Sequence, residues 1–203
     1  WFIINYYAID RAFAKTSVDA VQNVGRDTPG ISVIVANKNN GQGLARLIPV
    51  ILGQDYPNFE LIIVDDYSED GSAEMVEQNT DSKLKLINCS KDLPGKKQAL
   101  TEGIEAAQYD LLLFTDADCV PASDQWMRKM MLSQNADKAI VLGIAPMFAT
   151  PGFGAMISRT DTLDVLRQYV TAAIFNRPYM GVGRNLMYHK KLWEGVKGFE
   201  SHR

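Results

Sequence analysis

Two aspartates separated by a single residue follow an apolar run near the middle of the chain. Asp116 and Asp118 flank Ala117 directly after 111–115, whose side chains are almost all apolar. Two carboxylates so placed can converge on one hard cation, and Mg²⁺ and Mn²⁺ favour oxygen ligands that they share with substrate phosphates. Such a cation neutralises charge on a diphosphate leaving group. The alternative is a solvated turn, but the position behind a buried strand favours a site.

A second acidic pair follows another apolar run. Asp65 and Asp66 come directly after 61–64, and a carboxylate there can accept hydrogen bonds from a nucleobase or a ribose. Ser68 and Asp70, just downstream, are typical helix N-cap residues and are expected to cap rather than to bind a ligand. Two acidic pairs at neighbouring strand ends would line one cleft.

Two glycine-containing segments are further candidates. Gly95 and Lys96 open a predicted helix, and because helix N-termini favour anions, Lys96 either meets a phosphate or lies in a solvated basic turn. A second segment allows the backbone to approach a ligand closely, and it consists of Gly181, Val182, Gly183, Arg184 and Asn185.

The elements expected between these residues would bring them together. Short apolar runs predict strands at 31–36, 61–64, 84–88, 111–115 and 139–148, and a loop and strand over 180–188. Helical spacing predicts helices at 44–52, 72–78, 97–108, 123–134 and 153–175, and Pro49 should kink or shorten the first. Such alternation indicates an α/β fold with a mostly parallel sheet covered on both faces. Ligands bind these sheets at the carboxyl ends of the strands, where both acidic pairs fall.

Composition and charge narrow the class of protein. The chain has 203 residues, 46% hydrophobic and 22% charged, which is ordinary for one globular domain. Its net charge of −3 argues against a nucleic-acid partner. Cys89 and Cys119 fit no zinc or redox spacing and are expected to be free, buried thiols.

The two ends suggest a boundary and a missing segment. Residues 1–29 are expected to form a helical lead-in and linker, and 30–203 an α/β domain that is incomplete at its C-terminus. The run Trp1–Tyr7 is rich in aromatic residues, which favour the membrane–water boundary. It is either the end of a membrane anchor or a short helix packed on the domain.

Five motifs occur along the chain in a recognisable order: Ile31–Asn40, Gln54–Glu60, Val64–Ser72, Gly95–Leu100 and Thr115–Asp118. Together they resemble glycosyltransferase family 2, the inverting transferases with the Rossmann-like GT-A fold, over roughly residues 30–200. The resemblance implies a UDP- or GDP-sugar donor, Mg²⁺ or Mn²⁺ as cofactor, and a saccharide or lipid-linked acceptor. It also implies the cytoplasmic face of a membrane for the parent protein.

The resemblance also implies roles for individual residues. Asp66 would contact the nucleobase, with Asp65 beside it. Asp118 would bind the metal directly, and Asp116 would lie at the ribose or behind the metal. Lys96 would lie near the donor. The remaining donor-side residues would be Ala36, Asn37, Lys38, Asn40 and Ala117, and the acceptor-side residues Gly181, Gly183, Arg184 and Asn185.

Some positions depart from the family pattern. Ala36 stands where many members have proline, Asn40 where many have glutamate, and Tyr67 where glycine is common. Gly198–Phe199 resembles the segment that precedes the motif of the general base, but no such acidic motif follows it. Because inverting transfer needs a base to take the proton of the acceptor hydroxyl, the base is expected beyond Arg203. This chain alone is then expected to bind donor without transferring sugar.

Other functions stay open at this point. Asp116 and Asp118 also fit a haloacid-dehalogenase-like phosphatase, with the first as nucleophile and the second as acid/base. That motif normally lies on the first strand of its domain, and it leaves Asp65 and Asp66 without a role. A non-catalytic sugar-nucleotide-binding module is another possibility. A nucleotidyltransferase is less well supported, because Asn37–Gly41 is a poor version of its glycine-rich loop.

Overall fold

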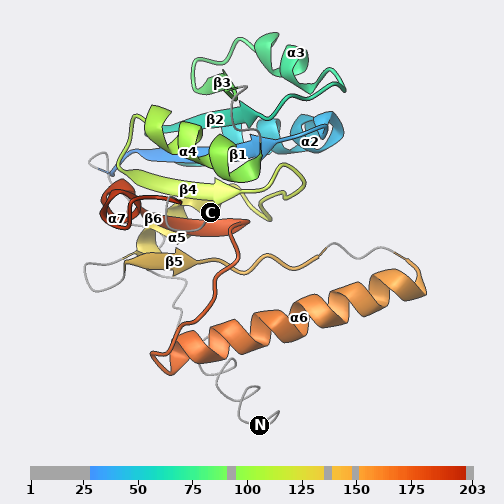
Figure 1. The fold of residues 1–203 in the computed structure, drawn as a ribbon, viewed down its shortest axis with the longest axis vertical. Coiled ribbons are helices and arrows are strands. Elements are labelled where there is room, and N and C mark those ends of the chain that lie inside the picture. The colour runs from blue at the N-terminus through green and yellow to red at the C-terminus, as the bar shows by residue number, and fades with distance from the viewer. Residues whose placement is uncertain (1–27, 91–94, 135–138, 148–150, 200–203) are drawn as a thin grey trace.

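The computed structural model describes residues 28–90, 95–134, 139–147 and 151–199, and within them a six-stranded sheet has the order β3-β2-β1-β4-β6-β5 (Figure 1). Its strands are β1 (Ile31–Asn37), β2 (Phe59–Asp65), β3 (Leu84–Asn88), β4 (Leu111–Thr115), β5 (Ile140–Leu142) and β6 (Asn185–His189). The first four are parallel, whereas β6 runs antiparallel to β4 and β5 to β6. This agrees with the predicted α/β fold. The predicted lead-in lies almost wholly outside the described residues.

Helices cover both faces of the sheet. They are α2 (Gly41–Leu52), α3 (Ser72–Glu77), α4 (Lys96–Ala106), α5 (Trp126–Ser133), α6 (Phe153–Ile174) and α7 (Lys190–Gly195). Alternate residues of β1 face opposite layers: Val33 packs with α2 and α5, whereas Ile34 packs with α4 and α7. With both faces covered, β2 and β4 are buried along their whole length, which explains the apolar runs Leu61–Val64 and Leu111–Phe114 within them.

Helix α4 lies directly on the central strands because it contains a glycine at the contact. A Cβ at Gly103 would lie 2.7 Å from Cγ2 of Ile34 and 3.0 Å from Cγ2 of Val64. No larger residue fits there without a shift of the helix. The close packing fixes the start of α4, Lys96, at the edge of the sheet where the parallel strands end.

Three expectations about the elements need correction. Pro49 was expected to kink or shorten its helix, but it does not shorten it: the helix continues to Leu52, with the proline on its exposed side. The helix expected over 123–134 begins only at Trp126, since the backbone before it turns to bond with the segment after α2. The strand expected over 139–148 is limited to β5. Gly143 and Pro146 follow it, and both disfavour strand continuation.

Helix α6 is present as predicted but does not pack as a core helix. Figure 1 shows it apart from the sheet, beyond β5. Of its 22 residues only Tyr169 and Thr171 are buried, while the apolar side chains of Met156, Ile157 and Leu163 are exposed. None of the helices in the described part of the chain is long and apolar enough to span a membrane.

A buried carboxylate fastens the amino-terminal ends of the strands. Glu60 of β2 accepts hydrogen bonds from Oγ of Ser32 at 2.5 Å and from the backbone N–H of Gln108 at 2.6 Å, and it pairs with Lys85 at 2.7 Å. Burial alone favours the neutral acid, but these donors together outweigh it and hold the pKa of Glu60 below its usual value. The network links β1, β2 and β3 at the end of the sheet opposite the acidic pairs.

Replacing Glu60 by glutamine tests this network. The variant keeps the size of the side chain but loses its charge, so we expect the free energy of unfolding at neutral pH to fall by about 2 kcal/mol. Because the folded-state pKa is lowered, the wild-type advantage is complete above the ordinary value of 4.5 and is lost as the pH falls through the folded-state value. Urea unfolding across this range measures it. Glu77→Gln, at the exposed end of α3, is the control, and equal losses in both variants would contradict the account.

Candidate functional site

A pocket of about 310 Å³ lies at the carboxyl ends of β1, β2 and β4. The chain leaves β1 toward β2 on one side, while β4 lies on the other. Open parallel sheets bind ligands at such a reversal of strand order. Every predicted donor-side residue except Asp65 lines this pocket: Ala36, Asn37, Lys38, Asn40, Asp66, Lys96, Asp116, Ala117 and Asp118.

Asp65 is turned away from the pocket into a buried network. Its carboxylate accepts hydrogen bonds from Nδ2 of Asn37 at 3.0 Å and from the backbone N–H of Ser68 at 2.8 Å. The Asn37 amide also lies within hydrogen-bond distance of the hydroxyls of Ser68 and Ser72. Asp65 therefore holds the turn after β2 against the end of β1, and the structure does not bring it to the donor side as expected.

Of the two residues expected to cap a helix, Asp70 accepts from helix N-terminal N–H groups and Ser68 does not. The residue before α3 is Gly71, which makes no side-chain cap. Oγ of Ser68 instead accepts from the N–H of Asn39, and Asp70 accepts from the first N–H groups of both α2 and α3. The cap of α2 is Asn40, whose Oδ1 accepts from the N–H of Gly43 at 3.1 Å. The departure of Asn40 from the family's glutamate thus coincides with a helix N-cap.

Asp66 is oriented by contacts to both of its oxygens. Oδ1 accepts from the N–H of Gly95 at 3.0 Å, and Oδ2 pairs with Nζ of Lys38 at 3.2 Å. Gly95 has a φ of 130°, a backbone conformation that residues other than glycine rarely adopt. The backbone N–H of Gly95, before α4, therefore helps to orient the carboxylate of Asp66, although 29 residues separate the two.

Tyr67 accounts for another departure from the family pattern. Its φ is 57°, in the left-handed region, where glycine is unstrained. The phenol hydroxyl donates a 2.6 Å hydrogen bond to the carbonyl of Cys89. This bond, which glycine cannot make, offsets part of the backbone strain and joins the turn after β2 to the end of β3.

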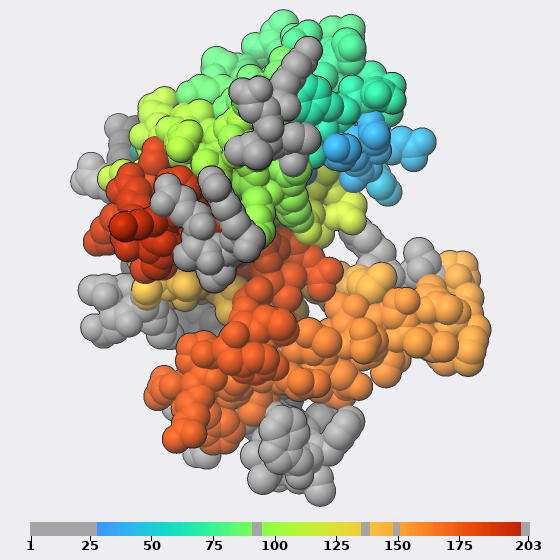
Figure 2. Space-filling model, viewed as in Figure 1, coloured from blue at the N-terminus to red at the C-terminus, as the bar shows by residue number. Residues whose placement is uncertain are grey.

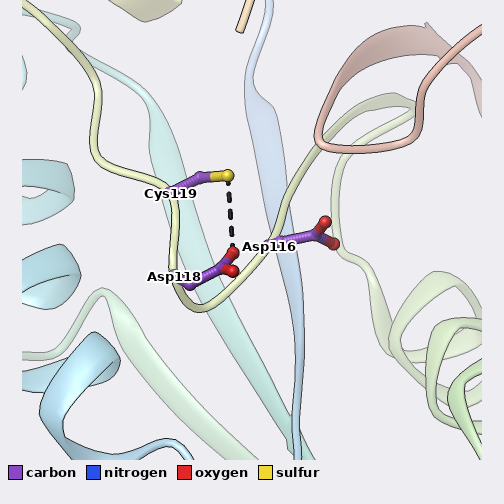
Figure 3. Close-up of side chains that lie close together, drawn as sticks. All are labelled: Asp116, Asp118 and Cys119. Atoms are coloured by element: carbon purple, nitrogen blue, oxygen red, sulfur yellow. Dashed lines mark hydrogen bonds between the residues drawn. The ribbon is translucent and has the colours of Figure 1, made fainter. Parts of the chain in front are cut away.

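The acidic loop after β4 gathers three candidate ligand atoms. Asp116, Asp118 and Cys119 each place one within 4.8 Å of the others (Figure 3). The thiol donates to Oδ1 of Asp118 at 3.5 Å. Burial, and then the carboxylates of Asp118 and Asp116, raise the pKa of Cys119 to about 11. The neutral thiol is therefore a hydrogen-bond donor to the loop and a poor ligand for a hard cation.

The two carboxylates fit Mg²⁺ or Mn²⁺. Both are accessible, and they offer the oxygen atoms that these cations prefer. Asp116 pairs with Nζ of Lys96 at 2.6 Å, but the lysine side chain is 63% exposed and can exchange partners. The pocket side chains comprise two lysines and three aspartates. They therefore need added positive charge to hold a diphosphate.

Helix α2 abuts the same loop through Gly43, a residue outside the predicted donor-side set. A Cβ on Gly43 would lie only 2.4 Å from the carbonyl oxygen of Ala117. The glycine pair in Gly41-Gln42-Gly43 signals such a close approach, but its spacing does not identify the partner.

Cys119 was expected to be a free, buried thiol. It is free, but it is only partly buried.

The predicted acceptor-side residues lie outside the pocket lining. Asn185 begins β6 opposite Thr115, and its side chain accepts from Nε1 of Trp126 at 3.0 Å. Gly181 lies against Leu142 on β5. These contacts place the segment one strand away from the acidic loop. Glu200 to Arg203, and the position expected for a general base, lie outside the described residues.

Comparison with known proteins identifies the family. The model of Glycosyl transferase family 2 matches residues 32–195. Glycosyltransferase AglE of Haloferax volcanii is 25% identical over 177 residues, covering 86% of this chain and 57% of that protein. Poly-beta-1,6-N-acetyl-D-glucosamine synthase of Staphylococcus epidermidis is 32% identical over 107 residues, which cover 51% of this chain and 25% of that protein. The chain thus spans about half or less of the length of these relatives.

Solved structures share the fold. Mannosyltransferase PcManGT from Pyrobaculum calidifontis, in complex with GDP-Man and Mn²⁺, superposes with a TM-score of 0.67 at 20% identity, covering 99% of this chain and 56% of that one. S. aureus TarS 1-349 in complex with UDP-GlcNAc superposes with a TM-score of 0.56 at 16% identity, covering 83% of this chain and 47% of that one. The match to the family favours a transferase over the phosphatase alternative for Asp116 and Asp118. Because the family model spans most of the chain, this protein belongs to glycosyl transferase family 2.

Proposed function

We propose that the pocket binds a UDP- or GDP-sugar, with Asp66 at the nucleobase and Asp118 at the diphosphate. The observation that carries this proposal is the convergence of the ends of β1, β2 and β4 on one pocket that contains three carboxylates and two exposed lysines. PcManGT and TarS, which share the fold, were solved with GDP-Man and UDP-GlcNAc.

Charge explains how the pocket would receive its ligand. Lys38 and Lys96 each pair with an aspartate, and both ammonium groups are more than half exposed. Exposed ion pairs contribute little to stability, so the lysines can turn to the phosphates at small cost. Asp66 is only 6% exposed and is held by Gly95, which keeps it in place to accept from the base.

Asp116 and Asp118 would hold Mg²⁺ or Mn²⁺ in this pocket. When bound, the cation supplies positive charge that stabilises the diphosphate as leaving group. The residues of the chain position the donor around it: Lys96 neutralises Asp116 before binding, and the Cys119 thiol orients Asp118.

The proposed reaction is transfer of the sugar, with inversion, to a saccharide or a lipid-linked acceptor. The segment Gly181–Asn185 is proposed to border the acceptor, because β6 lies beside β4 and its acidic loop. A general base must take the proton of the acceptor hydroxyl, and we place it C-terminal to the described residues. In the complete protein we propose that this reaction takes place at the cytoplasmic face of a membrane.

Calorimetric titration with UDP and GDP, with and without Mn²⁺, tests the donor site. We expect binding of at least one diphosphate to require Mn²⁺, and Asp118→Ala to weaken it by at least about tenfold, because a metal ligand is lost. Asp110→Ala, an exposed aspartate before the other end of β4, is the matched control and should bind as wild type does. If Asp118→Ala bound the diphosphate as tightly as wild type does, the proposed metal and donor site would be contradicted.

Gly95→Ala tests whether backbone geometry orients Asp66. The alanine is strained at a φ of 130°, so we expect about 1–2 kcal/mol of destabilisation and weaker nucleotide binding. Gly152→Ala provides the control, because Gly152 precedes α6 with a similar φ of 121° and lies outside the pocket lining. It should lose comparable stability in thermal unfolding without losing affinity. If both variants bind the diphosphate normally, Gly95 does not position Asp66.

A further inference from the structure

Lys96 pairs with one of the two carboxylates that are proposed to hold the metal. Its ammonium nitrogen lies 2.6 Å from Oδ1 of Asp116, closer than the 3.2 Å between the ammonium nitrogen of Lys38 and Asp66. A divalent cation on Asp116 would meet this ammonium group directly, because even the other oxygen of the same carboxylate lies beside it, and like charges repel. Binding of the cation therefore requires Lys96 to move away from Asp116.

The backbone of Lys96 is fixed, whereas its side chain can move. Lys96 is the first residue of α4, it follows the Gly95 N–H that donates to Asp66, and α4 packs closely on the sheet through Gly103. Helix α4 lies at the surface of the molecule that Figure 2 shows, and the Lys96 side chain is 63% exposed. Its flexible four-carbon stem can therefore carry the ammonium group to another anion while the helix stays in place.

A diphosphate in the pocket is a stronger partner for this ammonium group than the carboxylate is. Lys96 and Asp116 line one pocket together with Asp118. A nucleoside diphosphate brings several charged oxygens into that pocket, and lysine ammonium groups bind phosphates readily. The exposed ion pair that must break contributes little to stability. Transfer of the ammonium group from Asp116 to the phosphates is thus favourable, and it leaves the charge of Asp116 uncompensated.

We propose that Lys96 couples the binding of the metal to the binding of the diphosphate. In the unliganded pocket its ammonium group is an internal cation on Asp116 and opposes the binding of Mn²⁺ or Mg²⁺. The diphosphate draws the ammonium group away, so Asp116 becomes available to the cation. Each ligand then raises the affinity of the pocket for the other by the same factor. This inference rests on the proposed function, because both ligands must share the pocket.

The affinity for the cation alone distinguishes this role of Lys96 from simple phosphate binding. Direct contact between a cation and a phosphate couples the two ligands in any such site. If Lys96 bound only phosphate, its removal would leave the affinity for Mn²⁺ alone unchanged. Because Lys96 holds Asp116, its removal instead raises that affinity and reduces the coupling.

Electron paramagnetic resonance tests the coupling, because Mn²⁺ in free solution gives a signal that bound Mn²⁺ loses. The affinity for Mn²⁺ is measured alone and with saturating UDP or GDP, with a correction for the Mn²⁺ that free diphosphate holds. We expect Lys96→Met to bind Mn²⁺ alone about fivefold more tightly than wild type does, since no ammonium group competes for Asp116. With diphosphate present the variant should bind Mn²⁺ no more tightly than wild type, so the coupling factor should fall at least about fivefold.

Three further variants are matched controls. Lys38→Met removes the same charge from the same pocket but leaves the pair of Lys96 and Asp116, so it should raise the affinity for Mn²⁺ alone by less than about twofold. Lys97→Met removes a charge from the next residue of α4, outside the pocket lining, and should bind both ligands as wild type does. Lys96→Arg keeps the charge and should restore weak binding of Mn²⁺ alone.

Three outcomes would overturn the coupling while the proposed donor site stands. The first is an unchanged affinity for Mn²⁺ alone in Lys96→Met. The second is an equal rise in Lys38→Met, which would assign the effect to the total charge of the pocket. The third is an unchanged coupling factor in Lys96→Met, which would assign the coupling to the contact between cation and phosphate. A wild-type chain that binds neither UDP nor GDP with Mn²⁺ would instead contradict the proposed function itself, and the coupling with it.

Discussion

The amide of Asn37 is the contact on which the pocket depends. It joins the end of β1 to Asp65, its partner in register on β2, and to the serines of the following turn. The backbone carbonyl of Asn37 also accepts from the N–H of Asp66 at 2.8 Å. With Asp65 turned inward, the next residue must point to the other face, and Asp66 therefore enters the pocket. The buried carboxylate of Asp65 thus positions the carboxylate of Asp66 at the pocket.

Unfavourable backbone geometry and unbalanced charge are gathered around this pocket. Asn39 and Tyr67 have positive φ, and Gly95 has a φ open only to glycine. Each of them contributes a hydrogen bond that orients the turn or Asp66. Three carboxylates against two ammonium groups leave the pocket short of positive charge. Strain and charge of this kind persist where the surrounding structure compensates for them, and a metal with a diphosphate would complete the charge balance.

The strands and most of the pocket could be predicted from sequence because they follow local patterns. Unbroken apolar runs marked β1, β2 and β4, and the residues directly after them line the pocket. Asp65 could not be told from Asp66, because the difference depends on the Asn37 amide of a neighbouring strand. The roles of Ser68 and Asp70 likewise depend on contacts about 30 residues away. The exposure of α6 could not be predicted, because helical spacing shows which residues share a face of the helix and not whether another element covers that face.

The most direct test of the central claim is a crystal structure of this chain with Mn²⁺ and GDP or UDP, using the anomalous signal of manganese to locate the ion. The account predicts a single strong peak coordinated by Asp118, with the diphosphate on the ion and the base beside Asp66. An ion bound elsewhere, or a nucleotide outside the pocket between β1 and β4, would contradict it.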